Sequence, residues 1–104
     1  AFREISQPGA RIAVCPAGAI PYFSERGGVD LLGKVDPFVA RLPVSTRRPP
    51  NNACWRDAPG HNKEDDRAVF ELRKPEFSRY RPPPAVAALY AKVRYKGFQF
   101  FQRR

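Results

Sequence analysis

The sequence predicts a small single α/β domain with a mixed sheet, built from two N-terminal strand–turn–helix units and a C-terminal antiparallel hairpin. Three observations support this prediction. Two short apolar runs, 12–15 and 29–32, each end in a turn that a short helical pattern follows. Residues 92–96 alternate basic and apolar side chains, the period of a half-buried strand. A length of 104 residues suits one domain with a modest core.

The composition is that of a basic chain with ample aromatic material for a core. Nineteen Lys and Arg residues oppose ten Asp and Glu, for a net charge of +9, and the chain holds eight Phe, four Tyr and one Trp. Such a surplus attracts nucleic acid, phospholipid headgroups or phosphorylated ligands. The alternative is a basic surface that only solubilises the chain. No apolar run approaches the roughly 20 residues of a membrane span, and no signal-peptide pattern is visible.

The first ten residues are polar and are predicted as a lead-in, so that one domain spans residues 11–104. The domain opens with a strand over 11–15, which its β-branched content and the stop at Pro16 predict. A short helix is expected over 17–24, with Pro21 near its first turn, where the missing N–H costs little.

The second unit repeats this order. A turn is expected over 25–28 and a strand over 29–32. The Asp36-Pro37 pair predicts a helix start, because the Asp side chain can cap free N–H groups while Pro suits the first helical position. The residues expected to shape the turns of both units are Gly18, Pro21, Gly33 and Asp36.

The middle of the chain is less regular. Residues 44–59 show no periodicity and are predicted to form a long loop, and long loops in small domains tend to be functional or mobile. Acidic residues before 68–72 favour a helix there, with a strand as the alternative. Residues 76–80 are expected to be extended.

The C-terminal segment follows the stiff polyproline stretch 82–84. We expect one helical turn within 85–90, a strand over 92–96 and a returning strand over 98–103, with Gly97 at the turn. In this hairpin the basic side chains would face water while Val93, Tyr95 and some Phe residues enter the core.

The chemistry-bearing residues do not indicate a metal, a cofactor or a catalytic group. His61 is the sole histidine, and it lacks zinc-ligand spacing to Cys15 and Cys54. Walker, dinucleotide-glycine and G-x-S-x-G motifs do not occur. Two cysteines are too few to define a disulfide framework; Cys15 is either a free buried thiol or bridged to Cys54, as an oxidising compartment would favour.

Several short motifs occur in a recognisable order between Arg11 and about Tyr80. The sequence reads CPAGAIPYFSERGGVDLLGKVDPFVAR over residues 15–41, then Pro-Gly-His-x-Lys over 59–63 and Arg-Lys-Pro-Glu over 73–76. This pattern resembles the soluble C-terminal domain of bacterial membrane glycosyltransferases of the GT-C kind, including the arabinofuranosyltransferase-like and mannosyltransferase-like branches. The matched residues are Ala17, Gly18, Pro21, Tyr22, Val29, Asp30, Gly33, Asp36, Val39, Ala40, Arg41, His61 and Lys63.

The resemblance implies an extracytoplasmic domain, periplasmic or at the cell surface, that follows a bundle of membrane helices. Such enzymes take a sugar from a polyprenyl-phosphate donor, and their catalytic carboxylate lies in the membrane part. The chain is therefore expected to be an accessory domain that is not catalytic alone. Its expected partners are a glycan acceptor, the phosphate of a polyprenyl lipid and the membrane surface.

The candidate ligand-binding residues are Asp30, Arg41, His61, Lys63 and Tyr22. If these motifs meet at the carboxyl edge of the sheet, Asp30 would orient His61 or pair with Lys63. An anionic or sugar ligand would then meet Lys63 and Arg41. The alternative is structural: Asp30 caps the turn at Gly33 or pairs with Arg41. Tyr22 would contact sugar or pack against the domain.

The aromatic and basic residues 90–104 permit a different function. Such a hairpin could stack bases and hold phosphates or rest on an anionic membrane surface. A small basic nucleic-acid-binding protein is therefore the alternative function, and a stand-alone protein of unknown role is a third. An exposed sheet edge could also pair two copies into a homodimer.

Overall fold

The computed structural model describes residues 1–15, 18–31, 36–43 and 66–104. These residues confirm the predicted small α/β domain with a mixed sheet, whereas the long loop predicted at 44–59 lies outside them. The elements are α1 (Phe2–Ile5), β1 (Arg11–Val14), α2 (Ala19–Ser24), β2 (Gly27–Asp30), α3 (Pro37–Ala40), α4 (Asp66–Arg73), β3 (Phe77–Ser78), the 3₁₀ helix η1 (Ala87–Leu89), β4 (Tyr90–Tyr95) and β5 (Phe98–Arg103).

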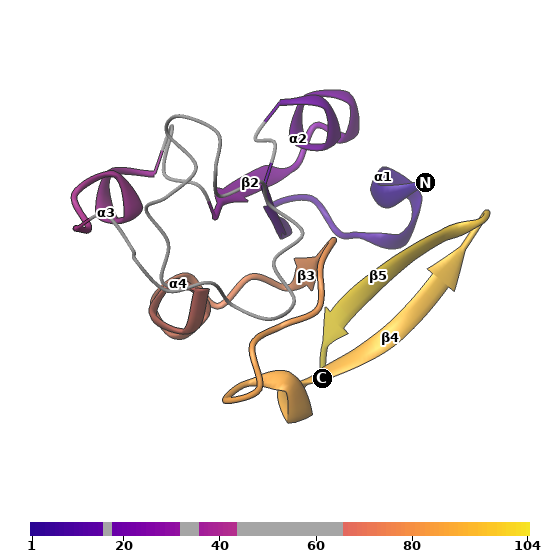
Figure 1. The fold of residues 1–104 in the computed structure, drawn as a ribbon. Coiled ribbons are helices and arrows are strands. Elements are labelled where there is room, and N and C mark those ends of the chain that lie inside the picture. The colour runs from indigo at the N-terminus through magenta and orange to yellow at the C-terminus, as the bar shows by residue number, and fades with distance from the viewer. Residues whose placement is uncertain (16–17, 32–35, 44–65) are drawn as a thin grey trace.

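The five strands form one sheet in the order β2-β1-β3-β5-β4 (Figure 1). Strand β1 pairs in parallel with β2 and β3, whereas β5 pairs antiparallel with β3 and β4. The two predicted N-terminal units supply the parallel pair β1–β2, and the predicted C-terminal hairpin is β4–β5. No helix within the described ranges is long and apolar enough to cross a membrane.

Strand β2 starts at Gly27, two residues before the predicted start at 29, and ends at Asp30 rather than at 32. The reason is close packing. A Cβ at Gly27 would lie 2.7 Å from the Cγ of Arg11 on β1, and one at Gly28 would lie 2.7 Å from the Cγ of Pro21 on α2. The prediction was wrong here because glycines are poor strand formers, although only glycine lets these segments approach so closely.

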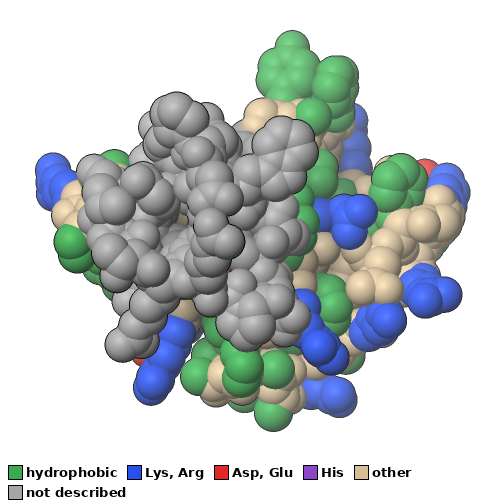
Figure 2. Space-filling view, in the orientation of Figure 1, with side chains coloured by type: hydrophobic (Ala, Val, Ile, Leu, Met, Phe, Trp, Pro, Cys, Tyr) green, Lys and Arg blue, Asp and Glu red, His purple; other side chains and the backbone are tan. Residues whose placement is uncertain are grey.

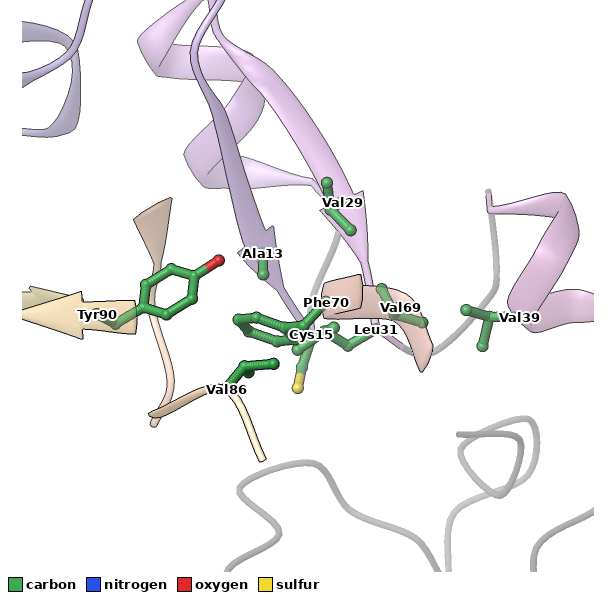
Figure 3. Packing of buried hydrophobic residues seen from close by; sticks show 9 residues of the cluster. All are labelled: Ala13, Cys15, Val29, Leu31, Val39, Val69, Phe70, Val86 and Tyr90. Carbon is green, nitrogen blue, oxygen red and sulfur yellow. The ribbon is translucent and has the colours of Figure 1, made fainter. Parts of the chain in front are cut away.

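The sheet buries apolar side chains on both faces. Along β1, Ile12 and Val14 point to one face and Ala13 to the other, and all three are fully buried. Val39 of α3 and Phe70 of α4 pack on the Ala13 face (Figure 3). The members of this first cluster are Ala13, Cys15, Val29, Leu31, Val39, Val69, Phe70, Val86 and Tyr90.

The opposite face holds a second cluster, which joins the N-terminus of the chain to its C-terminal hairpin. Phe2 of α1 packs edge-on against Phe77 of β3, with ring centroids 5.1 Å apart, and also contacts Phe100 of β5. Residues 1–10, predicted as a lead-in, thus contain a helix, and Phe2 is only 5% exposed. A four-residue helix is too short to show a periodic pattern, so the sequence did not indicate it.

Asp36 confirms the predicted helix start and also links two helices. Its carboxylate accepts hydrogen bonds from the backbone N–H groups of Phe38 and Val39 at the first turn of α3. It also accepts two from the Arg73 guanidinium at the end of α4, at 3.0 and 3.1 Å. Partial burial alone would raise the pKa of Asp36. The hydrogen bonds from Arg73 and the backbone outweigh burial, and the pKa lies below its ordinary value.

We predict that Asp36→Ala lowers the free energy of unfolding by about 2 kcal/mol, because the variant loses a helix cap and a charge-assisted pair. Urea denaturation of both proteins measures the loss. The matched control is Arg3→Ala, which removes an exposed Arg3–Glu25 pair and should cost about 0.5 kcal/mol or less. Equal losses in the two variants would contradict the role given to Asp36.

We further predict that Asp36 contributes to acid sensitivity. Because its folded-state pKa is lowered, its contribution is complete above the unfolded-state pKa of about 3.9 and is lost as the pH falls through the folded-state value. Below about pH 4, the stability difference between the natural protein and Asp36→Asn should therefore shrink. Denaturation curves across this range measure the difference, and a difference independent of pH would refute the prediction.

Candidate phosphate-binding surface

A tight turn fixes the register of the β4–β5 hairpin. Lys96 and Gly97 connect the strands with φ angles of 47° and 79°, the positive values of a two-residue type I′ turn. Tyr95 and Phe98 form the closing pair, and the register continues to Tyr90 opposite Arg103. A slip of one residue would exchange the two faces of the hairpin, so this turn determines where each side chain points.

The register places Lys92 and Arg94 on one face of β4 and Val93 and Tyr95 on the other. Lys92 and Arg94 alternate with Val93 and Tyr95 along β4, and both are exposed. Opposite them on the same face are Phe101 and Gln99; on the other face Tyr95 lies opposite Phe98. The hairpin therefore presents one basic face, and its exposed aromatic residue Phe98, 53% exposed, belongs to the other.

The positive charge of the hairpin region is largely uncompensated. Residues 77–104 contain seven Lys and Arg residues and no Asp or Glu, and Lys and Arg side chains gather over this end of the molecule in Figure 2. Within the described ranges, the one ion pair made by these seven cations is Lys96–Glu4, at 2.6 Å. Arg79 instead donates to the backbone oxygen of Gln99, at 3.3 Å. We call Arg79, Lys92, Arg94 and Gln99 the basic hairpin surface.

A shallow hollow of about 450 Å³ lies at the hairpin tip, lined by Arg94, Tyr95, Lys96, Gly97 and Gln99. Its guanidinium, ammonium and amide groups are hydrogen-bond donors suited to an anion. The hydrogen bond between Lys96 and Glu4 raises the pKa of Lys96 and lowers that of Glu4, so both groups stay charged. The lining therefore offers positive charge and hydrogen-bond donors.

The predicted ligand-binding residues are not all brought together by the described part of the chain. Asp30 is buried, 2% exposed, and lies beside Val14 in the register. Arg41 is exposed at the end of α3, and the salt bridges among described residues do not join it to Asp30. The structural alternative of an Asp30–Arg41 pair is therefore wrong. His61 and Lys63 lie outside the described residues, and their pairing with Asp30 stays a prediction.

Tyr22 is brought to the surface rather than into the core. Tyr22 and Phe23 on α2 are each 77% exposed, and their rings contact each other edge to face with centroids 5.1 Å apart. The interpretation that they pack into the domain is wrong. Gly18 precedes α2 as its N-cap and Pro21 lies within the helix, as predicted, whereas Gly33 lies outside the described residues.

Three contacts were missed from the sequence. Arg79 reaches β5, Glu4 holds Lys96, and Asp36 binds Arg73; each contact joins residues far apart in the chain. One signal was available, namely the absence of acidic residues from 77–104. This absence indicates that residues 77–104 carry positive charge that acidic residues of the same segment do not compensate.

Cys15 is disulfide-bonded, and the described residues include no free cysteine. Its thiol is therefore not a reactive group, and the alternative of a free buried Cys15 is wrong. Cys54, the only other cysteine of the sequence, lies outside the described residues. In the described part of the chain no cluster of three or more His, Cys, Asp and Glu residues could hold a metal ion.

Comparison with known proteins identifies a family. Residues 1–101 match the family described as Domain of unknown function (DUF8728), a range that includes the parallel strands, the helices of the described residues and most of the hairpin. No curated protein and no solved structure matches the chain. The chain belongs to the DUF8728 family.

Proposed function

We propose that the chain is an accessory binding domain that holds the phosphate groups of lipids at the outer surface of a membrane. The observation that carries the proposal is the basic hairpin surface. Lys92 and Arg94 project from one strand face without a carboxylate partner among the described residues, and basic groups near an anionic membrane contribute about 1 kcal/mol each. The domain binds and positions; it is not catalytic alone.

The resemblance to the soluble domains of GT-C membrane glycosyltransferases supports a lipid-linked phosphate as the ligand. In that setting the phosphate of a polyprenyl-phosphate sugar, or the headgroups around it, would meet the hairpin. Arg41 is available as a second contact, because it is exposed at the end of α3. The roles of His61 and Lys63 toward a glycan acceptor remain part of this proposal.

The bonded state of Cys15 supports an extracytoplasmic location. Disulfides persist in oxidising compartments such as the periplasm and the cell exterior and are rare in the cytosol. This observation also favours lipid phosphate over nucleic acid as the ligand.

A second candidate function, nucleic-acid binding by the same hairpin, is favoured by one observation. Phe101 lies opposite Lys92 on the basic face and is half-buried, so an edge of its ring could contact a base beside a phosphate contact. The two functions are distinguished by whether the hairpin binds lipid vesicles or an oligonucleotide more tightly.

We predict that Lys92→Gln/Arg94→Gln lowers the partitioning of the protein onto vesicles of phosphatidylcholine and phosphatidylglycerol by about 30-fold, since two contacts of about 1 kcal/mol are removed. Co-sedimentation measures bound and free protein. The matched control, the α4 variant, is Arg67→Gln/Lys74→Gln, which removes the same charge from α4 and from the residue that follows it; it should change partitioning less than about threefold.

Two outcomes would contradict the lipid proposal. One is equal partitioning of the hairpin variant and the α4 variant. The other is tighter binding of a single-stranded oligonucleotide than of vesicles at the same salt concentration, with the same loss in the hairpin variant; this result would establish the second candidate instead.

We also predict that the unreduced, denatured protein contains no free thiol, because Cys15 is bonded. Titration with a chromogenic thiol reagent in guanidinium measures this, and the same titration after reduction provides the control. Detection of thiols before reduction would remove the argument for an oxidising compartment.

A further inference from the structure

The outer edge of β4 is open. Strand β4 lies at one end of the strand order of the sheet and pairs with β5 on one side only. Figure 1 shows it at the margin of the sheet. Within the described ranges, no backbone group outside the hairpin bonds to residues 91–95. At six residues, β4 is as long as any strand of the sheet, which is long enough to accept another strand.

The turn determines which backbone groups face outward. In a two-residue hairpin the closing pair, Tyr95 and Phe98, exchanges hydrogen bonds, and so does every second pair beyond it. The N–H of Arg104 donates to the oxygen of Leu89, at 2.8 Å, in this same alternation. The N–H and C=O groups of Lys92 and Arg94 therefore point away from β5, toward the open edge.

The same two residues thus offer free backbone groups in the plane of the sheet and cationic side chains on one face. An added strand would place every second residue directly opposite Lys92 and Arg94, with its side chains on the basic face. Carboxylates at those alternate positions would complement the cations.

A second copy of this chain fits the edge poorly. Antiparallel two-fold pairing of β4 with itself would set Lys92 against Lys92, Arg94 against Arg94, or Lys92 against Arg94 of the other copy, depending on the register. Like charges directly opposite each other destabilise a sheet, and basic residues on edge strands oppose self-association. The expected homodimer through this edge is disfavoured in each of these registers.

We propose that the edge of β4 binds an extended acidic segment of a partner protein by strand addition, with Asp or Glu at alternate positions opposite Lys92 and Arg94. The backbone groups supply affinity and the two cations select the sequence. This inference goes beyond the lipid proposal and does not depend on it. Both would use Lys92 and Arg94, so an acidic strand and a lipid surface would compete for them.

The test uses the full chain and a fluorescent peptide of alternating Glu and Val residues, with binding followed by anisotropy. Two methylated forms of the peptide are compared. N-methylation of the Glu residues blocks the amides that face β4, whereas N-methylation of the Val residues blocks amides that face away. The expected result is more than tenfold weaker binding of the first form and little change in the second.

A charge exchange provides the second arm. Lys92→Glu/Arg94→Glu should lose more than tenfold in affinity for the Glu peptide and bind a peptide of alternating Lys and Val instead, with circular dichroism confirming the fold. An equal loss of affinity for the two methylated peptides would overturn the proposal, because it would show that the peptide binds by charge attraction without backbone hydrogen bonds to β4. Absence of peptide binding, or a concentration-dependent dimer abolished by the charge exchange, would also overturn it. Peptide methylation does not enter the vesicle experiment. A negative result for strand addition therefore leaves the lipid proposal standing, and a negative vesicle result leaves strand addition standing.

Discussion

The sheet depends on a strand of two residues. Phe77 and Ser78 form β3, which pairs in parallel with β1 on one side and antiparallel with β5 on the other. Among the described strands, β3 is the one that joins the parallel units to the hairpin in a single sheet, and both of its residues are buried. Phe77 adds its ring to the second cluster beside Phe2, while the Ser78 hydroxyl bonds to the backbone oxygen of Tyr80, at 2.7 Å. This short junction positions the hairpin, and with it the basic surface.

Local patterns predicted the elements well because the governing signals are local. Alternation indicated β4, the Asp36-Pro37 pair indicated the start of α3, and apolar runs indicated β1. Features that depend on distant partners were not predictable from the same signals. Gly27 lies in β2 because the Arg11 side chain of the neighbouring strand occupies the space that a Cβ at position 27 would need. Phe2 is buried because it packs against Phe77 of β3, 75 residues further along the chain.

One contact proposed for the candidate site is wrong for a physical reason. Spacing in the sequence could propose that Asp30 and Arg41 meet, but Asp30 lies inside the sheet and Arg41 on its surface. The hairpin was predicted better, because its signal is local. The alternation of residues 92–96 predicted that Lys92 and Arg94 point away from the face of Val93 and Tyr95, and the strand register confirms this separation. The sequence could not show which residues of the returning strand lie opposite the two cations; the register places Phe101 and Gln99 there.

We propose that phosphate-bearing lipid binds the basic hairpin surface, and an amide NMR titration of the labelled protein with nanodiscs containing phosphatidylglycerol tests this binding residue by residue. We expect signal changes to concentrate at Arg79, Lys92, Arg94 and Gln99 and to be absent with uncharged nanodiscs. Changes centred on the exposed Tyr22 and Phe23 of α2, or equal changes with uncharged lipid, would contradict lipid binding by this surface.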